Sequence, residues 1–219
     1  MFVKVGRARV GLVLKRLREK YGSLKAFSGS TKTPFECLFG TMLSTRTRDE
    51  QTEKAARNLF SRFNSLEKLA NASLKEIREL IKPVGFYKTK ARNVKKTARM
   101  LLRDYGGRIP DSMDELLKLP GVGRKVAGCV LVYAFGKPRI PVDTHVFRLS
   151  HRLGWSKAKT IEKTEVELER LISKRDWIDV NNLLVLHGQQ TCKPLKPLCP
   201  QCILKNVCPS AVKYYPKGR

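Results

Sequence analysis

The stretch Leu119-Pro120-Gly121-Val122-Gly123-Arg124-Lys125-Val126-Ala127 decides the fold of this chain. It places Gly121 and Gly123 in a tight turn between a helix that begins near Ser112 and an apolar helix that runs towards Phe135. Glycine lets a backbone approach a ligand closely, and the N–H groups at a helix N-terminus can bind a phosphate oxygen. Such a turn would hold DNA without reading its sequence. The plainer alternative is an ordinary turn between two helices.

Lys125 follows this turn and falls in the first turn of the second helix. The positive end of the helix dipole and the neighbouring Arg124 disfavour a charged ammonium there, and a lysine must lose its proton to act as a nucleophile. Further along, Pro141-Val142-Asp143-Thr144-His145 offers an aspartate where another helix should begin. We expect the carboxylate of Asp143 to cap that helix while facing the lysine. The alternative is a surface lysine and an ordinary N-cap aspartate.

Helical periodicity dominates the rest of the chain. Residues 33–36 combine an N-cap Thr, a Pro at the first helical position and a Glu at the third, and an apolar helical stripe follows them. The capping-box pattern recurs at 73–76 and 112–115, and another apolar stripe stops at Gly106-Gly107. The two stripes comprise Phe35, Leu38, Phe39, Met42 and Leu43, and Val94, Ala98, Leu101, Leu102 and Tyr105. Because strand alternation is nearly absent, we predict an all-α protein of about nine to eleven helices, with a basic amphipathic helix inside residues 1–22.

Charge narrows the class of partner. The chain has 45 Lys and Arg against 19 Asp and Glu, a formal charge of +26, which attracts polyanions. Nucleic acid and an anionic membrane surface would both attract a protein with this positive charge. No apolar segment of the sequence is long enough to favour binding to lipid. No secretion signal is recognisable at the start of the chain. We therefore expect an intracellular protein of the cytoplasm or nucleoid that binds nucleic acid and no membrane.

Four of the six cysteines crowd into one short segment near the end of the chain: Cys192, Cys199, Cys202 and Cys208. This proline-rich loop is too short to build an apolar core, so a metal centre is the expected organiser. The uneven spacing favours a [4Fe-4S] cluster over zinc, which prefers two close cysteine pairs; unliganded cysteines are the remaining alternative. Four thiolates would leave the cluster no open position for substrate, so its expected role is to hold Lys193 and Lys196 against phosphates. Cys37 and Cys129 are expected to be buried thiols.

Five motifs together resemble the endonuclease III family of the helix-hairpin-helix DNA glycosylase superfamily. They are LSTRTRD at 43–49, GFYKTKA at 85–91, the stretch at 119–149, LHGQQTC at 186–192 and the cysteine spacing. The resemblance covers about residues 33–208 and implies an all-α, two-lobed fold with a DNA groove between the lobes. It implies a six-helix barrel domain with the helix-hairpin-helix at 27–137, and a discontinuous helical domain at 1–26 and 138–219 that carries the [4Fe-4S] loop at 192–208.

The same resemblance implies roles for single residues. Lys125 would be the Schiff-base lysine and Asp143 the essential carboxylate; relatives that only remove a base generally lack this lysine. Family members often carry Gln where this chain has Arg46, at a position that fills the gap left by an extruded nucleotide. Phe86 would be the neighbouring wedge and His145 would line the pocket mouth. The further expected DNA contacts are Lys90, Gly121, Gly123, Arg124, Lys193 and Lys196.

Three functions are therefore compared. The first is a monomeric bifunctional DNA glycosylase/AP lyase of base excision repair, which removes oxidised pyrimidines and cleaves abasic sites in double-stranded DNA. The second is a monofunctional glycosylase for G:T or G:U mismatches, and the third is a non-catalytic helix-hairpin-helix DNA-binding protein. Lys125 favours the first function over the second, because the resemblance implies that enzymes which only remove a base generally lack this lysine. A lysine and an aspartate that both occupy helix starts favour an enzyme over the third. His151 and His187 are expected to be structural, each in an apolar helix without metal ligands nearby.

Overall fold

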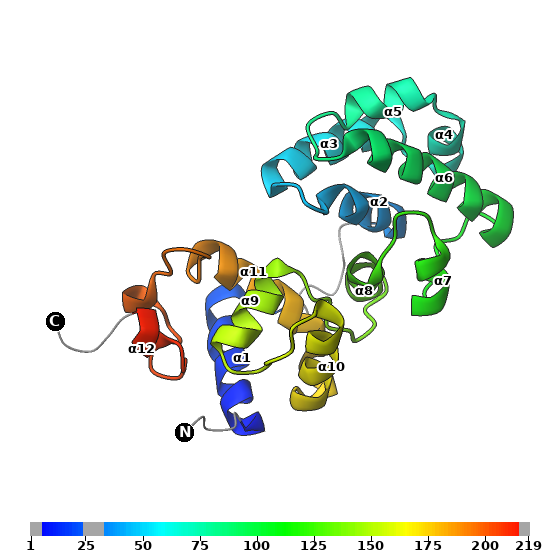
Figure 1. Cartoon of the computed structure of the whole chain (residues 1–219). Coiled ribbons are helices and arrows are strands. Elements are labelled where there is room, and N and C mark those ends of the chain that lie inside the picture. The colour runs from blue at the N-terminus through cyan, green and yellow to red at the C-terminus, as the bar shows by residue number, and fades with distance from the viewer. Residues whose placement is uncertain (1–5, 24–32, 215–219) are drawn as a thin grey trace. The chain divides into compact units, whose positions relative to one another are not determined.

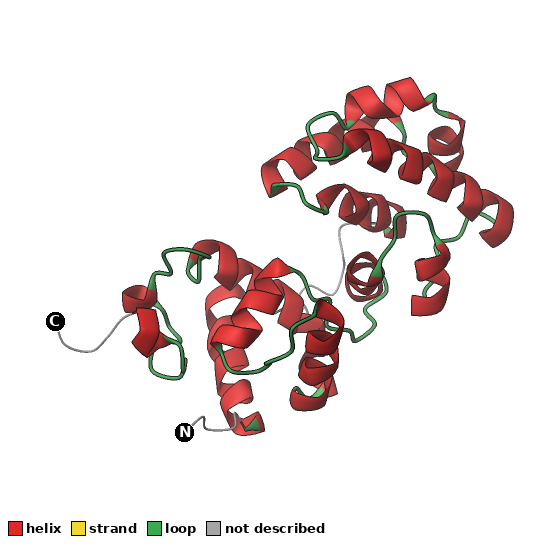
Figure 2. Ribbon diagram, viewed as in Figure 1, coloured by secondary structure: helices red, strands yellow, loops and turns green. Residues whose placement is uncertain are grey.

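The chain folds into helices that gather into two compact units. The computed structural model describes residues 6–23 and 33–214. The terminal unit comprises Met1–Gly29 and Pro138–Arg219, and the central unit comprises Ser30–Lys137. The described residues contain helices and no strand (Figure 1, Figure 2). The predicted all-α class is therefore confirmed. These residues form twelve α-helices rather than about nine to eleven, because several helices are very short, down to four residues in α12.

The central unit encloses one apolar core. Helix α2 packs against α3 and α8, and the long helix α6 packs against α4 and α5. Phe39, Leu59, Ile77 and Leu101 are fully buried at these contacts. The helices of this unit are α2 (Pro34–Ser44), α3 (Asp49–Arg62), α4 (Leu66–Asn71), α5 (Leu74–Leu80), α6 (Tyr87–Tyr105), α7 (Met113–Lys118) and α8 (Arg124–Tyr133).

Two of the three predicted capping boxes form. Thr33 and Ser73 each accept a hydrogen bond from the backbone N–H of the third helical residue, whose Glu side chain accepts from the cap in return. The third box is incomplete. Ser112 caps α7, but the Glu115 carboxylate accepts from Tyr105 and Lys118 instead of from the backbone of Ser112. A tertiary contact with the end of α6 has taken the carboxylate that the local pattern assigned to the cap.

The terminal unit has a smaller core, to which both ends of the chain contribute. Helix α11 packs against α9 and α1, and Leu14, Leu17, Val146 and Leu183 are almost fully buried between them. The elements are α1 (Arg7–Tyr21), α9 (Thr144–Arg152), α10 (Ile161–Leu171), η2 (Lys174–Asp176), α11 (Trp177–Gln190), η3 (Cys199–Gln201) and α12 (Ala211–Tyr214). The basic helix predicted within residues 1–22 is therefore confirmed as α1, whose apolar face lies in this core.

An ion-pair group ties α1 to α11. Arg18 donates to Asp176 and to Asp179, each at 2.7 Å, and the Ser23 hydroxyl donates to both oxygens of Asp179 at 2.9 Å. The Asp179 side chain is fully buried. A buried carboxylate is tolerated only when it is paired and hydrogen-bonded, so this group helps to hold the N-terminal helix on the C-terminal half of the unit.

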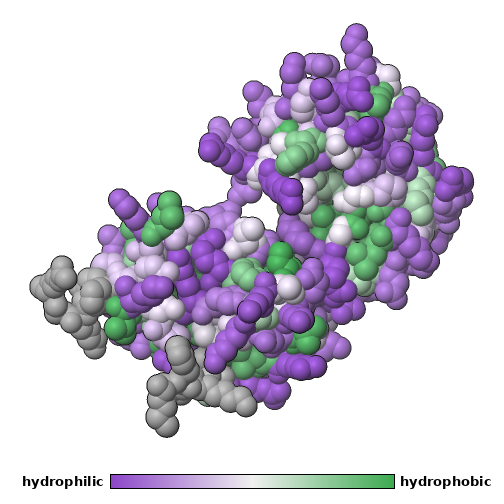
Figure 3. Space-filling view, viewed as in Figure 1, coloured by the Kyte–Doolittle hydropathy of each residue, from purple (hydrophilic) through white to green (hydrophobic). Residues whose placement is uncertain are grey.

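Most of the visible surface is hydrophilic (Figure 3), as a chain with 45 basic residues requires. Among the residues that the structure describes, no helix is both long and apolar enough to cross a membrane.

Candidate nucleic-acid interface and active site

The glycine turn joins α7 to α8 and is docked on α6. Gly121 has a φ of +79°, and a Cβ built there would lie 2.6 Å from Asn93 Nδ2, so only glycine fits. Thr97 fixes the same turn by donating to the Pro120 carbonyl at 2.9 Å. Gly123 is different, since its φ is −99° and a Cβ there would meet nothing within 4 Å. No crowding inside the protein requires glycine at 123, and its absence of a side chain leaves the start of α8 open to an outside ligand.

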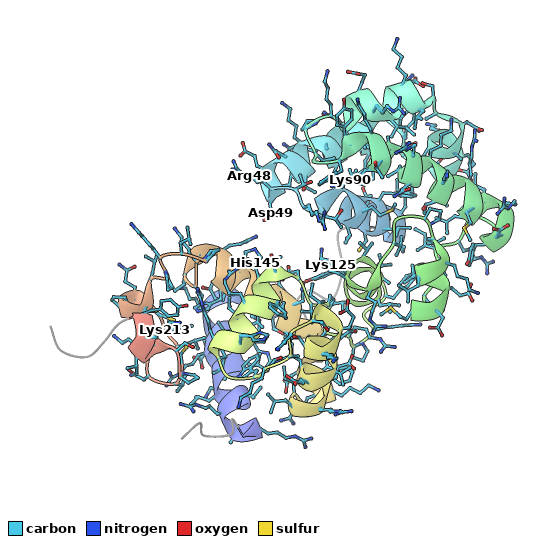
Figure 4. The ribbon with its side chains drawn as sticks, in the orientation of Figure 1. Arg48, Asp49, Lys90, Lys125, His145 and Lys213 are labelled. Carbon is cyan, nitrogen blue, oxygen red and sulfur yellow. The ribbon has the colours of Figure 1, made fainter. Side chains whose placement is uncertain are left out.

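Lys125 lies in the first turn of α8, as predicted, and is half-buried. Figure 4 labels it beside that helix. Its Nζ lies 3.5 Å from the Ser44 hydroxyl at the end of α2. The amine therefore lies beside a side-chain hydroxyl at the N-terminal end of α8.

Asp143 caps α9 in the terminal unit, so the predicted capping role is confirmed. Its Oδ1 accepts from the backbone N–H groups of His145 at 2.9 Å and of Val146 at 2.8 Å. Two bonds to one oxygen fix the orientation of the carboxylate. The aspartate is half-buried, so it stays accessible to a reacting group.

His145 is held by an arginine that the sequence patterns did not single out. Arg148 Nη2 lies 3.1 Å from His145 Nδ1 and donates to the Gly188 carbonyl, and the same guanidinium reaches the Cys192 carbonyl. Burial lowers the pKa of Arg148. A Cβ at Gly188 would lie 2.6 Å from the histidine ring, so this glycine lets α11 approach α9 closely. The available signal was an arginine three residues after His145, on the same helix face.

Arg46 and Phe86 form a strained pair on the surface of the central unit. Their φ angles of 51° and 58° are the only positive values at non-glycine positions in the described part of the chain. The Arg46 guanidinium lies 5.8 Å from the centre of the Phe86 ring, and Phe86 is 64% exposed. Disfavoured backbone conformations of this kind persist only where surrounding contacts hold them, and they cluster at functional sites of proteins.

Lys90 is buried inside the central unit, unlike a lysine on an exposed DNA-binding surface. It is only 8% exposed and lies between α6 and α2, where Figure 4 labels it. Its ammonium donates to the carbonyls of Leu43 at 2.7 Å and Thr45 at 2.6 Å, and to the Thr47 hydroxyl at 2.9 Å. Burial lowers the pKa of Lys90 to about 8. All three N–H donors of the ammonium thus have partners inside the protein.

The four clustered cysteines line one cavity at the end of the terminal unit, about 450 Å³ in volume including open solvent. None of them forms a disulfide. Burial raises the pKa of the thiols of Cys199, Cys202 and Cys208. A soft set of four thiols around a common space suits an iron-sulfur cluster. Within residues 6–23 and 33–214, no three His, Cys, Asp or Glu side chains are grouped to hold a single metal ion.

Two side chains from neighbouring helices reach these sulfurs. Arg152 Nη1 lies 3.2 Å from Cys192 Sγ, and His187 Nε2 lies 3.5 Å from Cys202 Sγ. The expectation that His187 has no metal-ligand residue nearby is therefore wrong, because the cysteine loop folds back onto α11. Burial and the nearby Lys20 lower the pKa of His187 to about 4, so its imidazole is neutral. Cys37 and Cys129 are buried in the central unit, as predicted.

Comparison with known proteins indicates the same class of protein as the glycine turn, Lys125 and Asp143 do. Residues 39–174 match the family model of the HhH-GPD superfamily of base excision DNA repair proteins. Endonuclease III of Thermotoga maritima is 49% identical over 175 residues, which cover 80% of this chain and 82% of that protein. This chain belongs to the endonuclease III family, and the predicted resemblance is confirmed.

Two solved structures support the assignment of the fold. A non-covalent endonuclease III–DNA complex matches with a TM-score of 0.87 at 32% identity and covers 95% of this chain and 98% of that one. A trapped endonuclease III–DNA covalent intermediate with an estranged adenine matches with a TM-score of 0.85 at 33% identity and the same coverage. The predicted helix-hairpin-helix glycosylase fold is therefore confirmed.

Proposed function

We propose that this chain is a bifunctional DNA glycosylase/AP lyase of base excision repair that acts on oxidised pyrimidines and abasic sites. The observation that carries the proposal is Lys125, a half-buried lysine in the first turn of the helix that follows the glycine turn. A lysine there supplies the nucleophile that a purely base-removing enzyme does not need. The trapped covalent intermediate known for a similar endonuclease III supports this chemistry.

The proposed reaction begins with extrusion of the damaged nucleoside, because C1′ of a stacked nucleotide is out of reach. The neutral amine of Lys125 then attacks C1′ as the C1′–N bond breaks and the base leaves with the bonding electrons. Asp143 stabilises the developing positive charge and assists proton transfer. Deprotonation of the attached nitrogen and cleavage of the C1′–O4′ bond, with protonation of O4′, convert this adduct into a Schiff base; at an abasic site the amine adds to the C1′ aldehyde and water leaves. The Schiff base acidifies the 2′ proton, and its removal expels the 3′ phosphate by β-elimination.

We propose double-stranded DNA with a damaged base or an abasic site as the partner of a monomeric, intracellular protein. Gly121, Gly123 and Arg124 would hold a DNA phosphate at the start of α8. Arg46 and Phe86 would insert into the DNA duplex, and His145 would lie near the extruded nucleotide. Exposed Lys193 and Lys196 would contact further phosphates. The central and terminal units would be the barrel and cluster domains.

We further propose that Cys192, Cys199, Cys202 and Cys208 hold a [4Fe-4S] cluster. The cluster would supply folding free energy to a loop with little apolar burial of its own. The residues around it fit this task, since Arg152 and His187 lie within hydrogen-bonding range of two of the sulfurs. It takes no part in the proposed bond-breaking steps.

Borohydride trapping tests the catalytic assignment. Wild-type protein incubated with a duplex that contains one abasic site or one oxidised pyrimidine should form a covalent adduct on reduction, because borohydride reduces a Schiff base. Lys125→Gln should abolish the adduct and keep measurable duplex binding. The matched control is Lys118→Gln, which removes an exposed charge paired with Glu115 on the other side of the turn and should trap normally.

Asp143→Asn should also form adduct much more slowly, since the amide cannot stabilise positive charge. Excision of bases by the wild type without any adduct would exclude the lyase mechanism and indicate a monofunctional mismatch glycosylase. Unchanged activity in Lys125→Gln and Asp143→Asn would sink both residue assignments.

A further inference from the structure

Lys90 closes the C-terminal end of α2. The last carbonyls of a helix lack partners within the helix and carry its partial negative charge. Lys90 Nζ donates hydrogen bonds to two carbonyl oxygens in this region, those of Leu43 at 2.7 Å and Thr45 at 2.6 Å. The lysine reaches them from α6, so one ammonium fixes the end of α2 onto the first turns of α6.

The third bond of Lys90 extends this contact to the turn that precedes α6. Lys90 donates to Thr47 Oγ1 at 2.9 Å, and the same oxygen accepts from the backbone N–H of Gly85 at 3.2 Å. Gly85 is packed so tightly that a Cβ would lie 2.9 Å from the Arg46 carbonyl oxygen. The loop at 45–47 and the turn at 85–86 are therefore joined to each other and to α6 through one buried side chain.

These two joined segments each present one strained residue. Arg46 sits between the Lys90 acceptors Thr45 and Thr47, and Phe86 follows Gly85. Left-handed φ angles are disfavoured for both residue types, so surrounding contacts must maintain them. Released from those contacts, the two backbones would relax and their exposed side chains would separate.

We propose that Lys90 is a positioning residue that holds Arg46 and Phe86 as a preformed pair for insertion into DNA, and that it does not itself contact phosphate. This inference rests on the proposed function and explains how the chain avoids ordering two loops at the moment of binding. Preformed side chains lose less conformational freedom on association than loops that must be ordered.

The polar contacts of Lys90 belong to a continuous face of α6. Phe86, Lys90, Asn93 and Thr97 follow one another at spacings of four, three and four residues, which place them on the same side of the helix. Asn93 contacts Gly121, and Thr97 donates to the Pro120 carbonyl. The face of α6 that positions Arg46 and Phe86 therefore also positions the glycine turn. Both elements are positioned within the central unit by the same helix.

Lys90→Met tests the proposal because methionine keeps the apolar stem and removes all three donors. The matched control is Lys95→Met on the same helix, where Lys95 donates to the Ala72 carbonyl at 2.6 Å, outside both joined segments. The substrate is an abasic-site duplex with 2-aminopurine in the opposite strand, whose fluorescence rises on unstacking. Full-length proteins are compared by this fluorescence, by KM and kcat for strand cleavage, and by binding to undamaged duplex at several salt concentrations.

Lys90→Met should reduce the fluorescence change and raise KM about tenfold, while kcat at saturation stays near the wild-type value. Lys95→Met should match the wild type in every measurement. Thr47→Val removes only the oxygen shared with Gly85 and should shift the same quantities in the same direction by less. This variant carries the test if Lys90→Met does not melt cooperatively.

Two outcomes would overturn the proposal. If Lys90 contacts phosphate, Lys90→Met will weaken binding to damaged and undamaged duplex alike and reduce the salt slope by about 1, with normal fluorescence in the bound state. If its role is only structural, Lys90→Met and Lys95→Met will show equal losses of activity and stability. Failure of the wild type to cleave or trap would reject the proposed lyase function, whereas the fluorescence and binding data would still judge Lys90.

Discussion

The two units order their surface loops by different means. In the central unit, Lys90 hydrogen-bonds the loop at 45–47 to α6 and Thr97 hydrogen-bonds the turn at 119–123 to the same helix, while Asn93 leaves no room for a side chain at Gly121. Both segments lie on a unit with its own apolar core. In the terminal unit, the cysteine loop contributes one fully buried apolar side chain, Leu204, and gathers around Arg152 and four sulfurs. The loops of the central unit are therefore ordered by contacts within the polypeptide alone, whereas the order of the cysteine loop depends on the group that its cysteines bind.

The largest expected effect is that of removing a cysteine from the terminal unit. Cys202→Ser should abolish incorporation of the cluster and, with it, the cooperative melting of the terminal unit, because cluster binding supplies folding free energy to this loop. Visible absorbance and iron content measure the loss. The control is Cys37→Ser in the central unit, which should keep full iron content and lose about 1 kcal/mol of stability through burial of a hydroxyl. Full iron in both variants would contradict the assigned ligands.

A second test removes the ion pairs that join the ends of the terminal unit. Arg18→Met leaves the fully buried Asp179 without its charged partner and should lower the free energy of unfolding of this unit by about 3 kcal/mol. Hydrogen exchange of α1 and α11 amides locates the loss. Arg103→Met, at the exposed pair with Asp104 in the central unit, should leave stability unchanged. Equal effects of the two substitutions would show that the buried group is no more than a surface contact.

The two glycines of the turn are expected to serve different purposes, Gly121 for folding and Gly123 for DNA binding. Gly121→Ala should cost about 2 kcal/mol, since alanine is disfavoured at a φ of +79° and its methyl group would meet Asn93. Gly123→Ala should melt like the wild type and bind DNA more weakly, because its methyl group meets only the space outside the protein. Thermal melting and duplex affinity are the two measurements. A stable Gly121→Ala would show that the turn is less rigid than its contacts indicate.

The smallest effect is expected from a single hydrogen bond. Thr97→Val keeps the shape of a fully buried side chain and leaves the Pro120 carbonyl without its donor, at a cost of about 1 kcal/mol. Exchange of amides should quicken at residues 119–123 and remain unchanged in the cysteine loop. Faster exchange in both places would argue against independent ordering of the two units.

Local signals predicted the elements that local interactions build. Thr33 and Ser73 begin helices as expected, and the position of Lys125 in the first turn of α8 follows from the glycines before it. The cap at Asp143 is likewise a contact within three residues. Patterns over such short distances carry their own geometry, so no knowledge of the tertiary fold was needed.

Tertiary partners explain most of what the sequence did not predict. The Glu115 carboxylate does not complete the cap because Tyr105, at the end of α6, donates to it, and Lys118 of its own helix, α7, donates as well. Lys90 bonds to acceptors more than forty positions earlier, and His187 meets a sulfur from a loop that folds back on its helix. The one available hint for Lys90 was the run of polar residues at 90, 93 and 97 on one face of α6. That spacing reads as a solvated face unless the neighbouring carbonyls are known.

The left-handed backbone at position 46 restricts how this enzyme could be redesigned or could diverge. The conformation is set by Gly85 and by the acceptors on either side of residue 46, so it will persist when the side chain is exchanged. Asparagine and glycine adopt such angles readily, whereas valine, isoleucine and threonine are strongly disfavoured. A mutant library aimed at altered opposite-base preference is therefore best enriched in unbranched and small residues at this codon.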